Sequence, residues 1–164
     1  MIDSFNGRNF FLSNMSVVDN PLVTPDGARV LTAEHYYMSM RFIDEKTRFN
    51  VANARADDRD DRIFAHGLAA KKMAHQYILE GQPHHKERYE RIAIMHSAVF
   101  CKFVTNPDFA RLLLETQNQK LVEGNDWGDV FWGVSPVGSS NGENYLGKIL
   151  MYVRQNIRER TQGR

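Results

Sequence analysis

The sequence predicts an α+β fold that is mostly helical, with a few short strands, and three observations support this. Apolar side chains recur at helical spacing in several segments, which is the main signal of amphipathic helices. Glycine and proline separate these segments, and the pair Asp26-Gly27 predicts a tight turn beside a short strand. With 42% hydrophobic and 25% charged residues, the chain has the composition of a globular protein. We therefore expect residues 1–164 to form a single compact domain.

Local start and stop signals set the order of the elements. After the Asp26-Gly27 turn, residues 29–31 favour a short strand, and Thr32 is a suitable N-cap for a first helix. Ile63 and Tyr89 begin the apolar stripes of two later helices and are expected to be buried. Further helices are predicted at about 57–80, 86–104, 107–115 and from Asn144 onwards, with a short strand at 121–122 and a loop over 126–142. The polar residues 158–164 are expected to fray.

Charge and cysteine content exclude several classes of protein. Twenty-one Lys and Arg against twenty Asp and Glu give a formal charge of +1. A general nucleic-acid or membrane-surface binder is normally strongly basic, although a near-neutral chain can still hold a local basic pocket. The single Cys101 excludes an intramolecular disulfide. We find no signal-peptide pattern and no run of about 20 apolar residues. A cytoplasmic protein without a membrane partner is therefore expected, and its oligomeric state stays open.

Two segments combine a carboxylate with aromatic side chains, at residues 32–37 and 129–133. Cleavage of a glycosidic bond passes through a cation-like sugar, which a carboxylate such as Glu34 or Asp129 can stabilise while another group protonates the leaving base. An aromatic face such as that of Trp132 can stack on a nucleobase. The alternatives are structural: Glu34 can be a partner of the helix dipole, Asp129 a turn residue and Trp132 a core residue.

Three cations could serve an anionic or sugar ligand. Arg41 follows Glu34 by seven residues, so the two side chains are expected on one helix face. Lys102 is either a salt-bridge partner or a desolvated amine that can form a Schiff base with an opened ribose. Lys148 follows the glycine-rich start of the last helix, where free N–H groups can hold phosphate. The alternative there is a plain turn, with Gly147 allowing close helix packing.

A metal site is not expected. His84 and His85 are adjacent and point about a quarter-turn apart on a helix, so they rarely chelate one ion. The chain has one cysteine and no His-x-x-x-His pair. His96 lies on an apolar stripe, which is typical of a core histidine. The sequence therefore predicts chemistry without metal or cofactor.

Taken together, these segments resemble the NADAR superfamily of YbiA-like N-glycosidases. Order and spacing match over nearly the whole chain. The matching segments are Phe11-Leu12-Ser13-Asn14, Glu34-His35-Tyr36-Tyr37 with Arg41-Phe42, Lys102-Phe103, Leu121-Val122-Glu123, residues 129–133, and Gly142-x-Asn144-x-Leu146-Gly147 with Leu150-Met151 and Arg154.

This resemblance implies a compact, largely helical α+β fold and hydrolysis of N-glycosidic bonds. The substrates that it implies are early riboflavin-pathway intermediates, split into ribose 5-phosphate and a pyrimidine, or ADP-ribosylated guanine in nucleosides or nucleic acid. Glu34, Asp129 and Lys102 are the predicted catalytic residues. The predicted substrate-binding residues are Ser13, Asn14, His35, Arg41, Trp132, Asn144, Gly147 and Lys148.

The sequence departs from the family pattern at two places. Arg41 stands where the family usually has a lysine, and arginine cannot act as an amine nucleophile, so Lys102 is the remaining candidate for that role. Tyr89 stands near the place of a frequent tryptophan. Two other functions remain open: a module that binds ADP-ribose or a nucleotide without turnover, and a small partner protein that binds no ligand.

Overall fold

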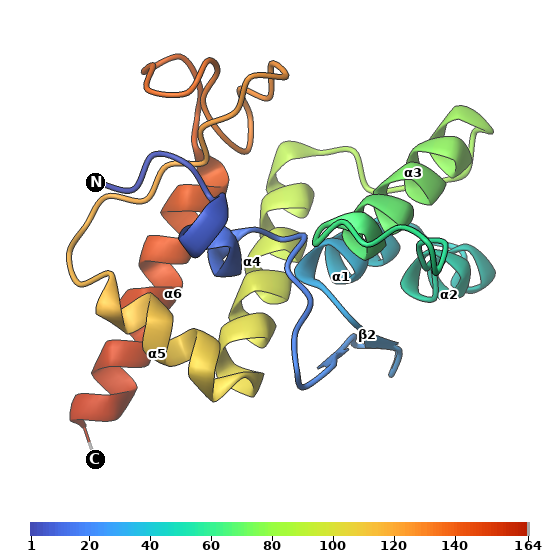
Figure 1. Ribbon diagram of the computed structural model, residues 1–164. Coiled ribbons are helices and arrows are strands. Elements are labelled where there is room, and N and C mark those ends of the chain that lie inside the picture. The colour runs from blue at the N-terminus through green and yellow to red at the C-terminus, as the bar shows by residue number, and fades with distance from the viewer. Residues whose placement is uncertain (164) are drawn as a thin grey trace. The chain divides into compact units, whose positions relative to one another are not determined.

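The computed structural model describes residues 1–163 and confirms a mostly helical α+β fold (Figure 1). In chain order the elements are the 3-10 helix η1 (Gly7–Leu12), β1 (Leu22–Val23), β2 (Arg29–Val30), α1 (Ala33–Met40), α2 (Glu45–Ala52), α3 (Ala65–Leu79), α4 (Arg88–Thr105), α5 (Pro107–Glu115) and α6 (Tyr145–Gln162). The chain divides into two compact units. The central unit is Asn14–Asn106, and the terminal unit combines Met1–Ser13 with the chain from Pro107 onwards.

The central unit begins with a two-stranded hairpin. Leu22 pairs with Val30 and Val23 with Arg29, in antiparallel register. The predicted turn at Asp26-Gly27 is present: Gly27 has φ +86°, and the Thr24 N–H donates to the Ala28 carbonyl at 2.9 Å. Glycine adopts this left-handed backbone without strain, which explains the turn. The strand expected at 29–31 is therefore confirmed at its first two residues.

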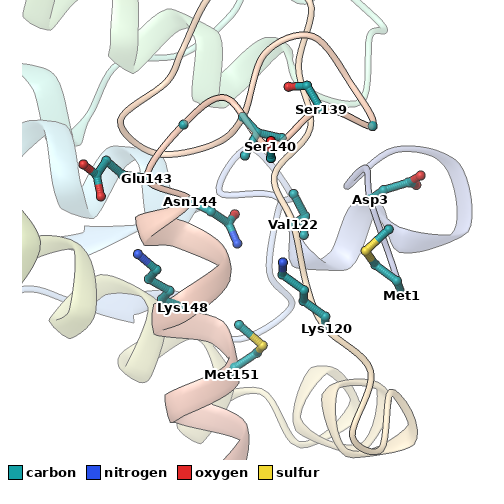
Figure 2. A pocket seen from close by; sticks show the side chains of 13 residues that line it. Met1, Asp3, Lys120, Val122, Ser139, Ser140, Glu143, Asn144, Lys148 and Met151 are labelled. Carbon is teal, nitrogen blue, oxygen red and sulfur yellow. The ribbon is translucent and has the colours of Figure 1, made fainter.

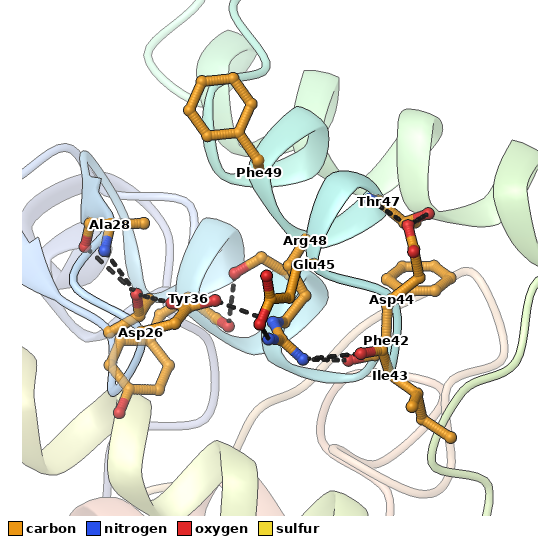
Figure 3. Close-up of polar contacts among 12 residues, drawn as sticks. Asp26, Ala28, Tyr36, Phe42, Ile43, Asp44, Glu45, Thr47, Arg48 and Phe49 are labelled. Atoms are coloured by element: carbon orange, nitrogen blue, oxygen red, sulfur yellow. Dashed lines mark hydrogen bonds and ion pairs between the residues drawn. The ribbon is translucent and has the colours of Figure 1, made fainter.

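Helix α2 joins this turn through one arginine (Figure 3). Arg48 donates from Nε to Asp26 Oδ2 at 2.8 Å and from Nη1 to the Ile43 carbonyl at 2.9 Å. Asp44 caps the helix by accepting the Thr47 N–H at 2.7 Å. The sequence analysis missed α2, because its residues form no apolar stripe at helical spacing.

Helix α1 is the core of the central unit and packs against α2, α3 and α4. Every α1 residue except the last is buried. Its N-cap is confirmed, since the Thr32 hydroxyl accepts the His35 N–H at 3.1 Å. Two buried positions were predicted wrongly: Ile63 precedes α3 and is 64% exposed, and Tyr89 is 72% exposed in the first turn of α4. The stripes of these helices begin further along the chain, at Ala65 and Met95.

The terminal unit is built on α5 and α6. Ile2 forms a parallel bridge with Leu121, and Gly124 forms one with Val134, so the loop predicted at 126–142 contains one bridged residue. Helix α6 continues to Gln162. Residues 158–162 are therefore helical, Arg164 lies outside the described residues, and the fraying expected of 158–164 stays a prediction. No helix among residues 1–163 combines the length and apolar character needed to cross a membrane.

Candidate active site

Glu34 lies in the first turn of α1 and is buried, with 6% of its surface exposed. Its backbone N–H donates to the Asn14 carbonyl at 3.0 Å, which joins the start of α1 to the segment that precedes the hairpin. Burial raises the pKa of Tyr37 and lowers that of Arg41, and the Glu34 carboxylate adds a smaller upward effect on the pKa of each. The buried carboxylate therefore interacts electrostatically with Tyr37 and Arg41, as the seven-residue spacing to Arg41 predicts.

Lys102 is buried almost completely, at 1% exposure, beside Met95 and Ala98 on α4. Its Nζ donates to the Ser16 hydroxyl at 2.7 Å. Of the two alternatives for Lys102, the buried amine is the one that this position fits. Ser16 was missed by the sequence analysis, because a serine in an irregular segment carries no pattern that distinguishes it.

The segment from Asn14 to Ser16 connects the surroundings of both groups. Asn14 accepts from the Glu34 backbone, and its Nδ2 lies 3.0 Å from the Met95 sulfur on α4. Ser16 holds the Lys102 amine. The central unit therefore brings the first turn of α1 and the buried face of α4 to one short stretch of chain.

Arg41 follows α1 as its C-cap and is half-buried. Its guanidinium carbon lies 5.7 Å from the centre of the Tyr37 ring, and Nη2 lies 3.5 Å from the His85 carbonyl. Burial lowers the Arg41 pKa, and the charge of Arg91 on α4 acts in the same direction. Arg91 itself donates from Nε to the Tyr37 hydroxyl at 3.3 Å. Sequence analysis missed Arg91, since an arginine next to an apolar stripe is usually solvated.

His35, which was predicted to bind substrate, is held by contacts inside the protein. The ring is fully buried, with Nδ1 at 2.8 Å from the Thr32 hydroxyl and Nε2 at 2.8 Å from the Ala54 carbonyl. Desolvation lowers the pKa of His35 to about 4, so the ring is neutral near pH 7. With both nitrogens bonded inside the protein, His35 holds α1 in place.

Asp129 organises the aromatic loop of the terminal unit. Its Oδ1 accepts the backbone N–H groups of Phe131 and Trp132 at 3.0 and 2.9 Å. The Phe131 and Trp132 rings meet edge to face with centroids 4.7 Å apart, and Phe131 also lies 5.0 Å from Tyr145. The turn function of Asp129 is therefore present in the structure, and its catalytic function stays a prediction.

Asn144 and Gly147 join the last helix to residues 121–123. The Asn144 side chain donates to the Leu121 carbonyl at 2.9 Å and accepts the Glu123 N–H at 3.0 Å. A Cβ at Gly147 would lie 2.2 Å from the Leu121 carbonyl oxygen. These two residues therefore pack the last helix against residues 121–123, and the substrate contact expected of them stays a prediction.

The start of α6 does not offer the free N–H groups predicted for phosphate. The N–H groups of Asn144, Tyr145 and Leu146 donate to the carbonyls of Gly133, Phe131 and Trp132, at 3.0–3.2 Å. The loop that Asp129 shapes thus occupies the donors of the helix. A local sequence pattern cannot show this, because the acceptors come from a neighbouring loop.

Lys148 instead lines a cavity of about 260 Å³ in the terminal unit (Figure 2). Figure 2 shows Lys148 on α6, with Lys120 and Val122 on the segment beside it. Asp3 and Glu143 also line the cavity, so both signs of charge occur among its lining residues. Ser13, the last residue of the first stretch of this unit, donates its N–H to the Phe10 carbonyl at 2.9 Å.

Within residues 1–163 no group of three His, Cys, Asp or Glu side chains forms a metal site.

The chain is similar in sequence to a known domain family and to several known proteins. The model of the NADAR domain family matches residues 4–158. An N-glycosidase of Nostoc punctiforme is 32% identical over 128 residues, which cover 77% of this chain and 74% of that protein. N-glycosidase YbiA of Escherichia coli is 30% identical over 134 residues, which cover 80% and 73%.

Two further matches concern a longer relative and a solved structure. The chloroplastic riboflavin biosynthesis protein PYRR of Zea mays is 31% identical over 135 residues, which cover 77% of this chain but only 19% of that protein. The NMR structure of YbiA from E. coli matches with a TM-score of 0.76 and 25% identity, covering 100% of this chain and 90% of that one. The fold expected from the sequence is thus also that of a solved relative.

Proposed function

This chain belongs to the NADAR domain family, and we propose that it hydrolyses the N-glycosidic bond of a ribose-phosphate or ADP-ribose substrate and releases the base. The substrate is a riboflavin-pathway intermediate or ADP-ribosylated guanine, free or within nucleic acid. Relatives named N-glycosidase, at 30–32% identity over most of both chains, support the reaction type. The proposed compartment is the cytoplasm, because the single Cys101 needs no oxidising environment.

The setting of Glu34 is the observation that carries this proposal. Its carboxylate is buried at the start of α1, in electrostatic contact with Arg41 and Tyr37. In the direct reaction a water oxygen attacks the ribose C1, and the C1–N bond breaks. The electron pair leaves on the base nitrogen, which takes up a proton, while Glu34 accepts the proton of the water. A buried carboxylate also stabilises the cation-like sugar between these events.

Lys102 offers a second route to the same products. Its amine is buried beside the Ser16 hydroxyl, and burial disfavours the charged form of an amine. A neutral amine can attack C1 and displace the base, after which the sugar ring opens to a Schiff base that water hydrolyses. Borohydride added during turnover would reduce this Schiff base to a stable ribosyl adduct on Lys102. An active Lys102→Arg variant, with no adduct on the wild type, would leave direct attack by water.

A substrate panel tests the proposal. The protein is incubated with phosphorylated riboflavin-pathway intermediates and with ADP-ribosylated guanosine, and mass spectrometry detects the free base and the sugar phosphate. Ligand binding is followed in parallel by thermal unfolding, because a ligand that binds the folded state raises the melting temperature. We expect base release from at least one branch of the panel. A melting shift without any product would identify a binding module instead, and neither shift nor product would exclude both.

A further inference from the structure

Asn125 is a buried amide in the terminal unit that holds both ends of the loop carrying Trp132. It is 1% exposed and directly precedes the exposed residues 126–128. Its Nδ2 donates to the Asp129 carbonyl at 2.7 Å and to the Val134 carbonyl at 3.1 Å, and its Oδ1 accepts the Asp129 N–H at 3.0 Å. One side chain therefore joins the backbone before Trp132 to the backbone after it.

The partners of the Asn125 amide fix its orientation. An amide oxygen accepts hydrogen bonds and an amide nitrogen donates them. The oxygen faces a backbone N–H and the nitrogen faces two carbonyls, so a rotation of the amide by half a turn would lose all of these bonds. An aspartate has the same shape but lacks the donors, and an alanine lacks both groups. The position therefore requires asparagine.

Asp129 passes this constraint on to Trp132. The Asp129 backbone is held by Asn125, and its Oδ1 accepts the Trp132 N–H at 2.9 Å. The Trp132 carbonyl accepts the Leu146 N–H of α6 at 3.0 Å. Directly after Trp132, a Cβ at Gly133 would lie 2.9 Å from Asn125 Nδ2, so the chain also packs against this amide. The backbone of Trp132 is thus fixed from both sides by contacts that begin at Asn125.

We propose that Asn125 is a positioning residue for the substrate, which sets the place where the Trp132 ring contacts the base. This rests on the proposed function and on the base stacking predicted for Trp132, and it adds a residue that acts through the loop backbone. A ring that the fold already holds in place binds more tightly, because no further ordering is needed on binding. Loss of one stacking contact weakens nucleobase binding by roughly 5- to 150-fold.

A single-tryptophan protein makes the position of Trp132 measurable. The chain has two tryptophans, and Trp127 is 69% exposed in the same loop. Trp132 is half-buried, with its ring centroid 4.7 Å from that of Phe131. In a Trp127→Phe background, fluorescence and its quenching by acrylamide therefore report on Trp132 alone. We expect Asn125→Ala in this background to increase the quenching.

Ligands with and without a base test the link to substrate binding. The whole chain is titrated with guanosine 5′-monophosphate, cytidine 5′-monophosphate and ribose 5-phosphate. Asn125→Ala should weaken binding of at least one of the two nucleotides by roughly 5-fold or more. Binding of ribose 5-phosphate should stay unchanged, because this ligand has no base to stack. With a substrate from the panel, KM should rise by more than kcat falls, whereas a loss of folded protein lowers kcat alone.

Thr116→Val is the matched control for stability. Thr116 is 6% exposed in the same unit, and its hydroxyl donates to the Leu113 carbonyl at 2.6 Å and accepts from Arg154 at 2.7 Å. Loss of these bonds should lower the melting temperature by about 3–10 °C, as Asn125→Ala should. The control should leave Trp132 quenching and nucleotide affinity unchanged. Equal changes in both variants would show that Asn125 only stabilises the unit, and would overturn the proposal.

Asn125→Asp tests the donor bonds, and it also serves if Asn125→Ala does not fold. The carboxylate that it introduces keeps the acceptor for the Asp129 N–H but faces two carbonyls. Burial, these carbonyls and the nearby Asp129 charge should raise its pKa above the usual value of about 3.9. As the pH falls, the protonated carboxyl can donate to the Asp129 carbonyl again. We expect increased Trp132 quenching at pH 8 that returns towards the wild-type value at pH 5.5. Quenching independent of pH would overturn the function of the donor bonds.

The outcomes separate this proposal from the reaction itself. Wild-type affinity for both nucleotides in a folded Asn125→Ala variant would overturn it, even if hydrolysis is observed. Absence of nucleotide binding to the wild type would overturn it as well. Weaker nucleotide binding and increased Trp132 quenching in the variant, with no substrate hydrolysed by the wild type, would keep the positioning function of Asn125 and reject the N-glycosidase function.

Discussion

The two units use the residues of one family pattern in different ways. In the central unit, Glu34 and Lys102 are both buried. The Glu34 backbone N–H donates to Asn14, and the Lys102 amine donates to Ser16. In the terminal unit, Asp129, Asn144 and Gly147 hold the 130–133 loop and residues 121–123 against α6. The central residues have the chemistry of a site, and the terminal ones have the contacts of a scaffold. A shared motif therefore identifies residues that matter without showing whether they matter for reaction or for packing.

The largest expected effect is on Glu34. Glu34→Gln keeps the shape of the side chain but removes the base, so base release should fall by about 100- to 10,000-fold. The melting temperature should change little, because the amide can occupy the same space. The measurement is kcat/KM on the substrate found in the panel, with the exposed Glu45→Gln in α2 as control. Near wild-type turnover in a folded Glu34→Gln variant would show that Glu34 is not the catalytic base. The central unit would then no longer differ from the terminal unit in its chemistry.

His35 should give the next largest effect, and it appears in stability rather than in turnover. Its pKa is lowered to about 4 in the folded protein, against 6.5 for an ordinary histidine. The unfolded chain therefore binds the extra proton between these values, and the stability present at neutral pH is lost as pH falls from about 6.5 to about 4. The shift from 6.5 to about 4 corresponds to roughly 3 kcal/mol.

Urea unfolding at pH 7 and pH 4.5 measures this contribution. Carboxylates with lowered pKa values, such as Asp60 with a pKa of about 2, also lose stability in acid, mainly below this window. Comparison with His35→Gln separates them, since the variant retains the carboxylates and lacks the imidazole. The variant should be less stable at pH 7 and should lose less stability on acidification. An equal pH dependence in both proteins would show that His35 is not the neutral core residue described above.

Sequence patterns predicted the fold best at positions where a cap or turn residue bonds to its near neighbours in the chain. Thr32 as an N-cap and Asp26-Gly27 as a turn were correct because their bonds lie within four residues. Helix α2 was missed because it is stabilised by Asp44 and by Arg48, whose acceptor Asp26 is 22 residues away. Tyr89 was expected to be buried because its spacing continues the α4 stripe, yet it lies on the exposed side of the first turn of that helix, 72% exposed.

The candidate site shows the same limit. Spacing along α1 was enough to place Glu34 near Arg41, and the apolar face of α4 was enough to predict the burial of Lys102. The partners Ser16 and Arg91 come from other segments and carry no local signal. The phosphate site predicted at the start of α6 failed for the same reason, because its N–H donors are used by a loop whose position only tertiary structure decides.

Gly147 tests the scaffold function of the terminal unit. A Cβ there would lie 2.2 Å from the Leu121 carbonyl oxygen, so Gly147→Ala must displace backbone. Overpacking of this kind costs about 1–3 kcal/mol. For a chain of this size the melting temperature should fall by about 3–10 °C. Gly163→Ala, at the end of the same helix with its nearest atom at 3.4 Å, is the matched control and should melt like the wild type.

The smallest expected effect is the change in stability on substitution of Asp129. It tests directly whether the terminal unit serves as a scaffold or also takes part in the reaction. Oδ1 of Asp129 accepts two backbone N–H groups, and an asparagine amide oxygen can accept the same two bonds. Asp129→Asn should therefore keep the free energy of unfolding within about 0.5 kcal/mol, whereas Asp129→Ala should lose about 1 kcal/mol. Urea unfolding of both variants measures this difference.

The same pair of variants decides whether Asp129 also takes part in the reaction. A scaffold residue loses activity only to the extent that the Phe131-Trp132 loop loses its shape, so Asp129→Asn should retain turnover while Asp129→Ala declines with its stability. A catalytic carboxylate behaves differently, because Asp129→Asn then loses about 100-fold or more in kcat while its stability is unchanged. That second result would place catalytic residues in both units. The terminal unit would then contribute to the reaction and not only to packing. Retained turnover in Asp129→Asn would assign the acid–base chemistry to the central unit, with the terminal carboxylate acting through the position of Trp132.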